Sequence, residues 1–187
     1  MHTRAPLEIL ATQNSTRIEA LVPLRFERMS ADPFAFYRGT TGIMAADQGS
    51  DPHSGILVGS CGDAHIGNFG LYASPQRTLV FDLNDFDEAA WAPWEWDLKR
   101  LVTSVIVSGR STQRSEKVVE EAALRATRAY IRALRAALQT SPLDRYYTHF
   151  DPEVSRHRLD KVSRRALRAA QEKARRRTGA RAVRRLT

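Results

Sequence analysis

The sequence predicts an α+β domain that is mostly helical and carries a short β-hairpin. Apolar residues recur at helical spacing through much of the chain after residue 93. Two short apolar runs, 56–60 (ILVGS) and 78–83 (TLVFDL), have the length and composition of strands, and we expect them to pair as the hairpin. At 187 residues the chain is long enough to bury one ordinary core.

The segments before the first strand predict short elements. Residues 7–29 predict one or two short helices, interrupted at Pro23. The aromatic segment 31–42 opens with Asp-Pro and closes with two glycines, which favours a turn or a short strand over a helix. Residues 47–55 have the composition of a loop, and the run 56–60 that follows predicts a buried strand.

The segments after the second strand predict three helices. The first follows Pro93, and a long one runs from about Glu116 to Leu138, where Ser141-Pro142 marks its end. A further helical pattern covers 157–177. We divide the chain into an N-terminal helical segment (1–30), a catalytic and metal-binding core (31–150) and a basic helical tail (151–187).

Composition narrows the class of protein. No apolar run approaches the roughly 18 residues of a membrane helix, and the N-terminus lacks the pattern of a secretory signal. We therefore expect a cytoplasmic protein with no membrane association. Cys61 is the only cysteine, which excludes an internal disulfide and a Cys-based zinc site, and we expect it to be a small buried residue.

The net charge of +8 is concentrated at the C-terminal end. From Arg156 onward there are 13 Lys and Arg residues against two acids, a surplus of +11, so residues 1–155 carry −3. Clustered arginines can bind nucleic-acid phosphates, and a nucleic-acid-binding module is one alternative function. The tail lacks interleaved aromatic residues, which favours a solvated or partner-docking helix.

The most informative motif is the loop CGDAHIGNFG at residues 61–70. Asp63 is followed five positions later by Asn68, the spacing of the kinase catalytic loop. In such loops the Asp receives the proton of the acceptor hydroxyl and the Asn binds a magnesium ion. Both residue types are also common in turns, which is the structural alternative for each. His65 lies between them, and we expect it to orient the loop rather than bind metal.

A second cluster of carboxylates follows the strand at 78–83. Of Asp82, Asp85 and Asp87, one or two should bind metal, with Asp85 the first choice, Asp82 the second and Asp87 a supporting residue. An EF-hand is excluded because the required Gly and twelfth-position Glu are missing. Asp97 could support the loop by accepting backbone N–H bonds. Arg38 is a possible phosphate contact, and an ordinary ion pair is the alternative.

These motifs carry a family resemblance. The runs FAFYRGTTGIMAAD, CGDAHIGNFG and VFDLNDFDEAAWAPWEWDLKRL resemble the bacterial domain of unknown function 2252, over roughly residues 20–187. That family in turn resembles the aminoglycoside phosphotransferase and choline kinase branch of the kinase-like fold. The resemblance implies the C-terminal lobe of a kinase-like fold, with Asp63 as catalytic base, Asn68 and Asp85 on metal, and Asp97 bracing the loop.

The resemblance also implies Mg²⁺ as cofactor, ATP as co-substrate and a small hydroxylated molecule as acceptor. The chain departs from the kinase pattern because no Lys precedes Lys99 and no G-x-G-x-x-G occurs. The family is usually about twice this length, with those features in its later half, so we expect a truncated member. A pseudokinase or metal-binding scaffold is a further alternative.

Overall fold

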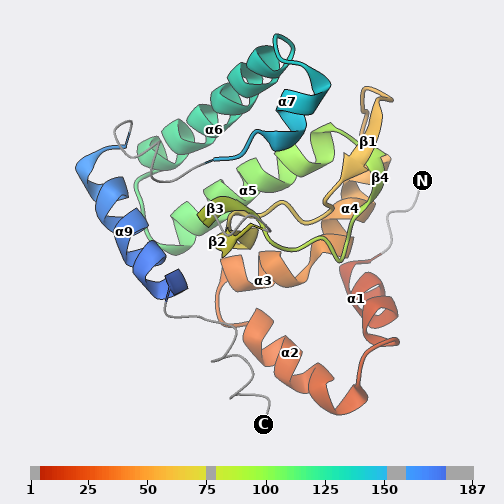
Figure 1. Ribbon diagram of the computed structural model, residues 1–187. Helices are drawn as coiled ribbons and strands as arrows, with labels where there is room; N and C mark the ends of the chain where they lie inside the picture. Colours follow the sequence, from red (N-terminus) through yellow and green to blue (C-terminus); the bar gives the residue numbers. More distant parts are fainter. Residues whose placement is uncertain (1–4, 75–78, 151–158, 176–187) are drawn as a thin grey trace. The chain divides into compact units, whose positions relative to one another are not determined.

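The computed structural model describes residues 5–74, 79–150 and 159–175 (Figure 1). The chain forms two compact units. The first contains residues 1–68 and 85–139, and the second contains residues 69–84 and 140–187. Each unit is described by itself below. The predicted division at residues 30 and 150 was based on composition and motifs, and it stays a prediction.

The first unit begins with four short helices. They are α1 (Pro6–Asn14), α2 (Val22–Met29), α3 (Pro33–Gly39) and α4 (Thr41–Ser50). The first three each have proline in the first turn, where the missing N–H costs no hydrogen bond. The prediction for residues 7–29 is confirmed, although Pro23 lies in the first turn of the second helix instead of in a break between two helices.

The prediction of a turn or strand over 31–42 is wrong. The segment contains α3 and the start of α4, because Asp32 caps the first of these helices. Its carboxylate accepts the backbone N–H groups of Phe34 and Ala35 at 2.8 and 2.9 Å. Such a cap outweighs the turn preference of Asp-Pro. The loop predicted at 47–55 is shorter than expected, since α4 extends to Ser50.

The prediction that the strands at 56–60 and 78–83 pair with each other is wrong. Strand β1 (Leu57–Ser60) pairs antiparallel with β4 (Ala90–Pro93), and β2 (Phe69–Ala73) pairs antiparallel with β3 (Leu79–Leu83). The two strands nearest in sequence pair because short connections favour hairpins. Strand β1 is also not buried, since Leu57 is 56% exposed.

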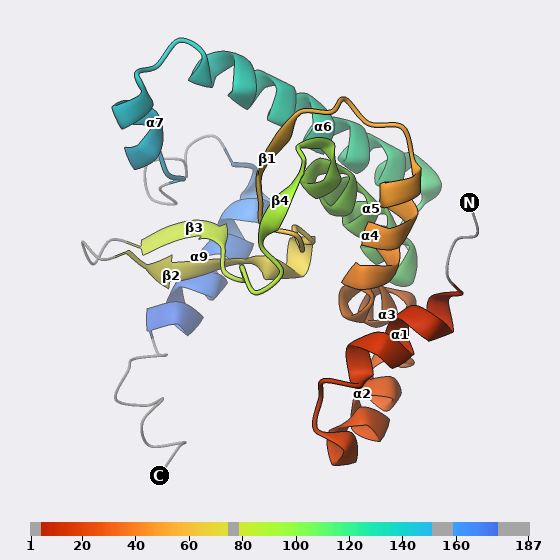
Figure 2. The same cartoon turned by 90° about the vertical axis from the view of Figure 1, so that its right-hand side faces the viewer.

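Helix α5 (Glu95–Ser111) is the centre of the first unit. It packs against α3, α4 and the long helix α6 (Glu116–Ala137), as the two views in Figures 1 and 2 show. The rings of Trp94 and Tyr130 stack with their centroids 6.0 Å apart and anchor the start of α5 on α6. Both helices were predicted: α5 from its start after Pro93, and α6 within one residue at each end.

The second unit is built on the β2–β3 hairpin. Helix α9 (Lys161–Arg175) packs on β2, and α7 (Pro142–Tyr147) begins at Ser141, whose side chain caps it. The ring of Phe81 contacts the rings of Phe69 and Phe150 at centroid distances of about 6 Å. The helix predicted at 157–177 is present from Lys161, and the ends of that range lie outside the described residues.

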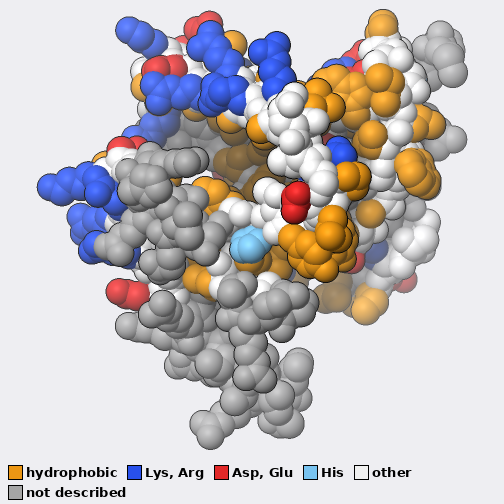
Figure 3. Space-filling view, turned by 45° about the horizontal axis from the view of Figure 1, so that its top comes forward, with side chains coloured by type: hydrophobic (Ala, Val, Ile, Leu, Met, Phe, Trp, Pro, Cys, Tyr) orange, Lys and Arg blue, Asp and Glu red, His pale blue; other side chains and the backbone are white. Residues whose placement is uncertain are grey.

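The predicted α+β class with mostly helical content is confirmed. Figure 3 shows one face, with Lys and Arg side chains gathered over α6 and hydrophobic side chains left on the surface. Buried polar residues are prominent in the first unit: Thr40, Gln48, Ser60, His65, Arg100 and Ser104. None of the described helices is both long enough and apolar enough to span a membrane.

We expect Asp32→Ala to lower the free energy of unfolding by about 1 kcal/mol, because two N–H groups of α3 lose their acceptor. Urea denaturation measures this change. Ser115→Ala at the start of α6 is the matched control, since Ser115 makes no side-chain cap bond there. An equal loss in both variants would contradict the capping role.

Candidate functional site

One side of α5 holds the loop at residues 61–68. Asp97, Arg100 and Ser104 are spaced three and four residues apart, so their side chains project from the same side of the helix. Each contacts a different part of the loop: its start, its candidate catalytic residue and its end. A rigid helix thereby sets the conformation of a loop that has no regular structure over most of its length.

Asp97 holds the start of the loop. Its carboxylate accepts the backbone N–H of Cys61 at 2.9 Å and of Gly62 at 3.1 Å, the kind of bond expected of a bracing aspartate. Gly62 has a φ of +81°, and a Cβ there would clash with the carbonyl oxygen of Glu88. The loop therefore requires glycine at this position.

Asp63 is oriented by a buried arginine. Nε of Arg100 donates to Oδ1 of Asp63 at 2.8 Å, and Nη2 forms an ion pair with the same oxygen at 2.7 Å. Arg100 is 2% exposed, and the side chain of Asp63 is 15% exposed. Both N–H groups use the same oxygen, so Oδ2 remains available. That oxygen lies 3.6 Å from Nε2 of His65.

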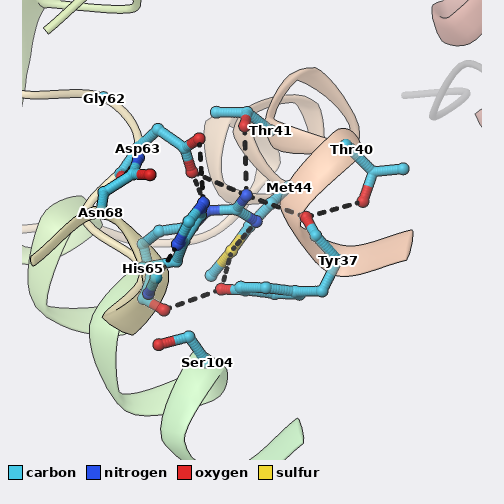
Figure 4. Close-up of polar contacts among 12 residues, drawn as sticks. Tyr37, Thr40, Thr41, Met44, Gly62, Asp63, His65, Asn68 and Ser104 are labelled. Carbon is cyan, nitrogen blue, oxygen red and sulfur yellow. Dashed lines mark hydrogen bonds and ion pairs between the residues drawn. The ribbon is translucent and has the colours of Figure 1, made fainter. Parts of the chain in front are cut away.

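Arg100 also contacts the junction of α3 and α4. Its Nη2 donates to the carbonyl oxygen of Tyr37 at 2.9 Å and to Oγ1 of Thr41 at 3.1 Å (Figure 4). The guanidinium lies 3.9 Å from the centre of the Tyr37 ring. Burial raises the pKa of Tyr37, and the tyrosine hydroxyl donates to the backbone carbonyl of Arg100 at 2.8 Å. The arginine therefore joins three segments at one point.

His65 is buried and bonds to its own loop. Its Nδ1 accepts the backbone N–H of Gly67 at 3.0 Å, so the neutral ring carries its proton on Nε2. Burial lowers the pKa of His65; Asp63 opposes this shift, and Arg100 and Arg38 add to it. Because the bond to Gly67 occupies Nδ1, these contacts agree with a residue that orients the loop.

Ser104 and Asn68 hold the end of the loop. Ser104 is fully buried, and its Oγ accepts the backbone N–H of Ile66 at 3.0 Å. Nδ2 of Asn68 donates to the carbonyl oxygen of Asp63 at 2.9 Å. The amide nitrogen is used in this bond, which leaves the side-chain oxygen of Asn68 as the atom available to a ligand.

A cavity of about 750 Å³ in the first unit brings candidate residues together. Five predicted site residues line it: Arg38, Asp63, His65, Asn68 and Asp85. The pairing of Phe69 with Leu83 explains how Asp85 reaches this cavity. Because the hairpin begins and ends at that pair, the residue before it, Asn68, and the residues after it, up to Asp85, lie near each other.

The strand-end acids separate into different roles. Asp85 lines the cavity, and its Oδ1 accepts the backbone N–H of Asp87 at 3.3 Å. Asp87 is exposed and is not in the lining. Asp82 lies within β3 in the second unit and accepts the N–H of Leu83 at 2.8 Å. Of the three, Asp85 shares the cavity with Asp63.

Any magnesium bound in this cavity would have few protein ligands and would keep several waters. Among residues 5–74, 79–150 and 159–175, no three His, Cys, Asp or Glu side chains group closely enough to hold a metal. Mg²⁺ does not require such a group, because it keeps several waters and binds one or two carboxylates with substrate phosphates. Asp85 and the side-chain oxygen of Asn68 could supply the protein ligands.

Sequence reasoning missed Arg100 and Ser104, although their spacing from Asp97 was visible in WDLKRLVTS. The expectation for Cys61 agrees with its surroundings. Burial, reinforced by Asp97, raises the pKa of Cys61 to about 12, so the thiol keeps its proton and is a poor nucleophile.

We expect Arg100→Met to lower the free energy of unfolding by roughly 3–5 kcal/mol, because Asp63 is left buried without its partner. Chemical denaturation measures the change. Arg110→Met is the matched control, since Arg110 pairs with Glu116 on the surface and its loss should change the denaturation midpoint little. Similar midpoints for the two variants would rule out a structural role for the buried pair.

We expect stability to fall as the pH drops below the ordinary His65 pKa of 6.5. The folded-state pKa is lower than this value, so the unfolded chain binds more protons in that range and is favoured. Protonation of Nδ1 also removes the bond from Gly67. Urea denaturation between about pH 7.5 and about pH 5.5 measures the effect.

His65→Asn is the control for this pH dependence, because its amide oxygen can still accept the Gly67 N–H but does not titrate. The loss of stability should be smaller in this variant. Equal pH dependence in both proteins would assign the effect to other groups.

Comparison with known proteins gives one match. A family model described as "Uncharacterized protein conserved in bacteria (DUF2252)" matches residues 17–187. No curated protein and no solved structure matches the chain. The family match covers the loop at 61–68, the aspartates that follow β3 and the polar side of α5. The chain therefore belongs to the DUF2252 family of bacterial proteins.

Proposed function

We propose that this chain carries the catalytic and magnesium-binding centre of a kinase-like phosphotransferase that acts on a small hydroxylated acceptor. The observation that supports this proposal is the common cavity of Asp63, Asn68 and Asp85. A kinase-type centre needs an aspartate for the acceptor hydroxyl and oxygen ligands for metal within reach of the same phosphoryl group.

Asp63 takes the role of catalytic base in this proposal. Arg100 engages Oδ1 and fixes the carboxylate, so Oδ2 is the atom that accepts the proton of the acceptor hydroxyl. His65 orients the loop beside that oxygen. In this proposal the protein acts mainly by positioning the carboxylate of Asp63 against the acceptor hydroxyl. The hydrogen bonds that hold the loop support such a role.

Asn68 and Asp85 would hold magnesium. Bound there, the ion would supply positive charge that neutralises the nucleotide phosphates. The side-chain oxygen of Asn68 is free for this role because its nitrogen bonds to the backbone of Asp63. Asp85 is exposed and keeps Oδ2 unengaged, which suits an atom that binds a hydrated ion.

The motifs support a likeness to the aminoglycoside phosphotransferase branch of kinases. The order of parts is the same: a Gly-Asp-x-His-x-x-Asn loop, a strand, an Asp-Phe pair and a Trp-Asp-Leu helix start. The lysine and glycine-rich loop that clamp phosphates in kinases have no counterpart in this sequence.

Two alternatives stay predictions. A nucleic-acid-binding module would use the basic tail, of which the structure describes residues 159–175 with the basic helix α9. A pseudokinase would bind nucleotide and magnesium without turnover, and calorimetric titration with ATP and Mg²⁺ separates it from an active enzyme.

We expect Asp63→Asn and Asp85→Asn each to lower Mg²⁺-dependent ADP production by about 100-fold or more, measured with ATP and a panel of hydroxylated acceptors. The first variant loses the proton acceptor and the second a metal ligand. Asp47→Asn is the matched control, because Asp47 lies exposed on α4 outside the cavity lining. Wild-type turnover in both site variants would refute the proposed centre.

A further inference from the structure

The cavity that contains Asp63 and Asp85 is rich in arginine. Four arginines line it, from the N-terminal half of the first unit: Arg17, Arg25, Arg28 and Arg38. The lining thus has four cationic side chains against two aspartates, although residues 1–155 carry a net charge of −3. One of the aspartates, Asp63, is already paired with the buried Arg100. The positive charge is therefore a local feature of this cavity.

Arg25 has a structural role. Its Nη1 donates to Oδ1 of Asn14 at 2.6 Å, and its Nη2 donates to the carbonyl oxygen of Gly39 at 2.7 Å. These bonds tie α2 to the end of α1 and to the end of α3. A single side chain therefore links these three helices, of which α2 and α3 line the cavity.

The other three arginines are uncommitted. Within the described residues, no hydrogen bond or ion pair involves the guanidinium of Arg17, Arg28 or Arg38. They come from the segment after α1, the last turn of α2 and the last turn of α3. Attraction to a helix C-terminus would account for the last two. It explains neither Arg17 nor the convergence of all three on one cavity.

The field of these arginines affects neighbouring basic groups. Burial lowers the pKa of Arg25, and the charge of Arg17 lowers it further. Arg38 likewise contributes to the lowered pKa of His65. Arginine remains charged under all physiological conditions, so the cavity keeps a persistent positive potential that favours a bound anion.

We propose that Arg17, Arg28 and Arg38 form a phosphate-binding wall that receives the polyphosphate chain of a nucleotide. Arginine matches phosphate oxygens with paired N–H donors, and three arginines from separate segments can contact successive phosphates. The wall would hold these phosphates by charge-assisted hydrogen bonds. This inference rests on the proposed function, since the phosphates it holds are those delivered to Asp63 and Asp85.

The same lining offers a surface for the organic part of such a ligand. Ile18, Leu21 and Leu24 line the cavity and are 70, 53 and 39% exposed. Apolar side chains beside a few charged groups are typical of sites for small organic ligands. A nucleoside triphosphate should therefore bind more tightly than inorganic tripolyphosphate.

Calorimetric titration of the full chain with sodium tripolyphosphate and with ATP, both without Mg²⁺, tests the wall separately from catalysis. We expect each of Arg17→Gln, Arg28→Gln and Arg38→Gln to weaken binding roughly tenfold. Added salt should weaken binding to the wild-type chain. Arg132→Gln on α6 is the matched control and should bind as wild type, because Arg132 is an exposed helical arginine outside the cavity. Thermal denaturation checks that the variants stay folded.

The outcomes separate this inference from the proposed function. Tripolyphosphate binding that depends on the three arginines, in a chain without turnover, would support the wall and reject the phosphotransferase. Wild-type affinity in all three variants would reject the wall, whatever the turnover. Glucose 6-phosphate is the test for a phosphorylated acceptor. If it binds through the arginines and ATP does not, the wall does not receive the nucleotide and the inference is wrong.

Discussion

The buried pair of Arg100 and Asp63 is the interaction on which the site depends. Arg100 lies on α5, and its guanidinium bonds both to the loop and to the junction of α3 and α4. Burying two charges is costly, so such a pair adds little stability over apolar residues of the same size. What it does provide is a single geometry. Arg100 holds one oxygen of the Asp63 carboxylate, and a rearrangement of the loop would leave the buried guanidinium without this partner.

The helices were predictable where their sequences carried local signals, and the strand pairing was not. Helix α6 has long amphipathic spacing and was predicted within one residue at each end, and α5 follows a proline, which marked its start. Helix α3 was missed because it is only seven residues long, and the Asp-Pro that opens it is shared by turns and helix caps. The strands β2 and β4 were missed because each is short and contains Gly, Ala or Pro. The two strands predicted to pair are β1 and β3. The segment between them contains β2, which was not predicted and which pairs with β3 instead.

The aspartates and the asparagine that line the cavity could be named from the sequence, but Arg100 and Ser104, which hold the loop from α5, were missed. Asp63, Asn68 and Asp85 stand in a spacing that points to one chemistry, and they line one cavity. Arg100 and Ser104 carry no such motif, since an arginine or serine in a helix is ordinary on a surface. Their roles come from facing a buried loop, which is a property of the tertiary structure. Asp82 lies within β3, and its role as a metal ligand stays a prediction.

The arginines of the first unit divide by burial and partners. Arg100 and Arg25 use their donors on protein oxygens, and these bonds hold the helices and the loop in place. Arg17, Arg28 and Arg38 have no such acceptors among the described residues and line the cavity that those bonds shape. All three are exposed and line the same cavity as two carboxylates. In our proposal an anion would complete the charge balance, and a metal-bound polyphosphate would contact the arginines and the aspartates together.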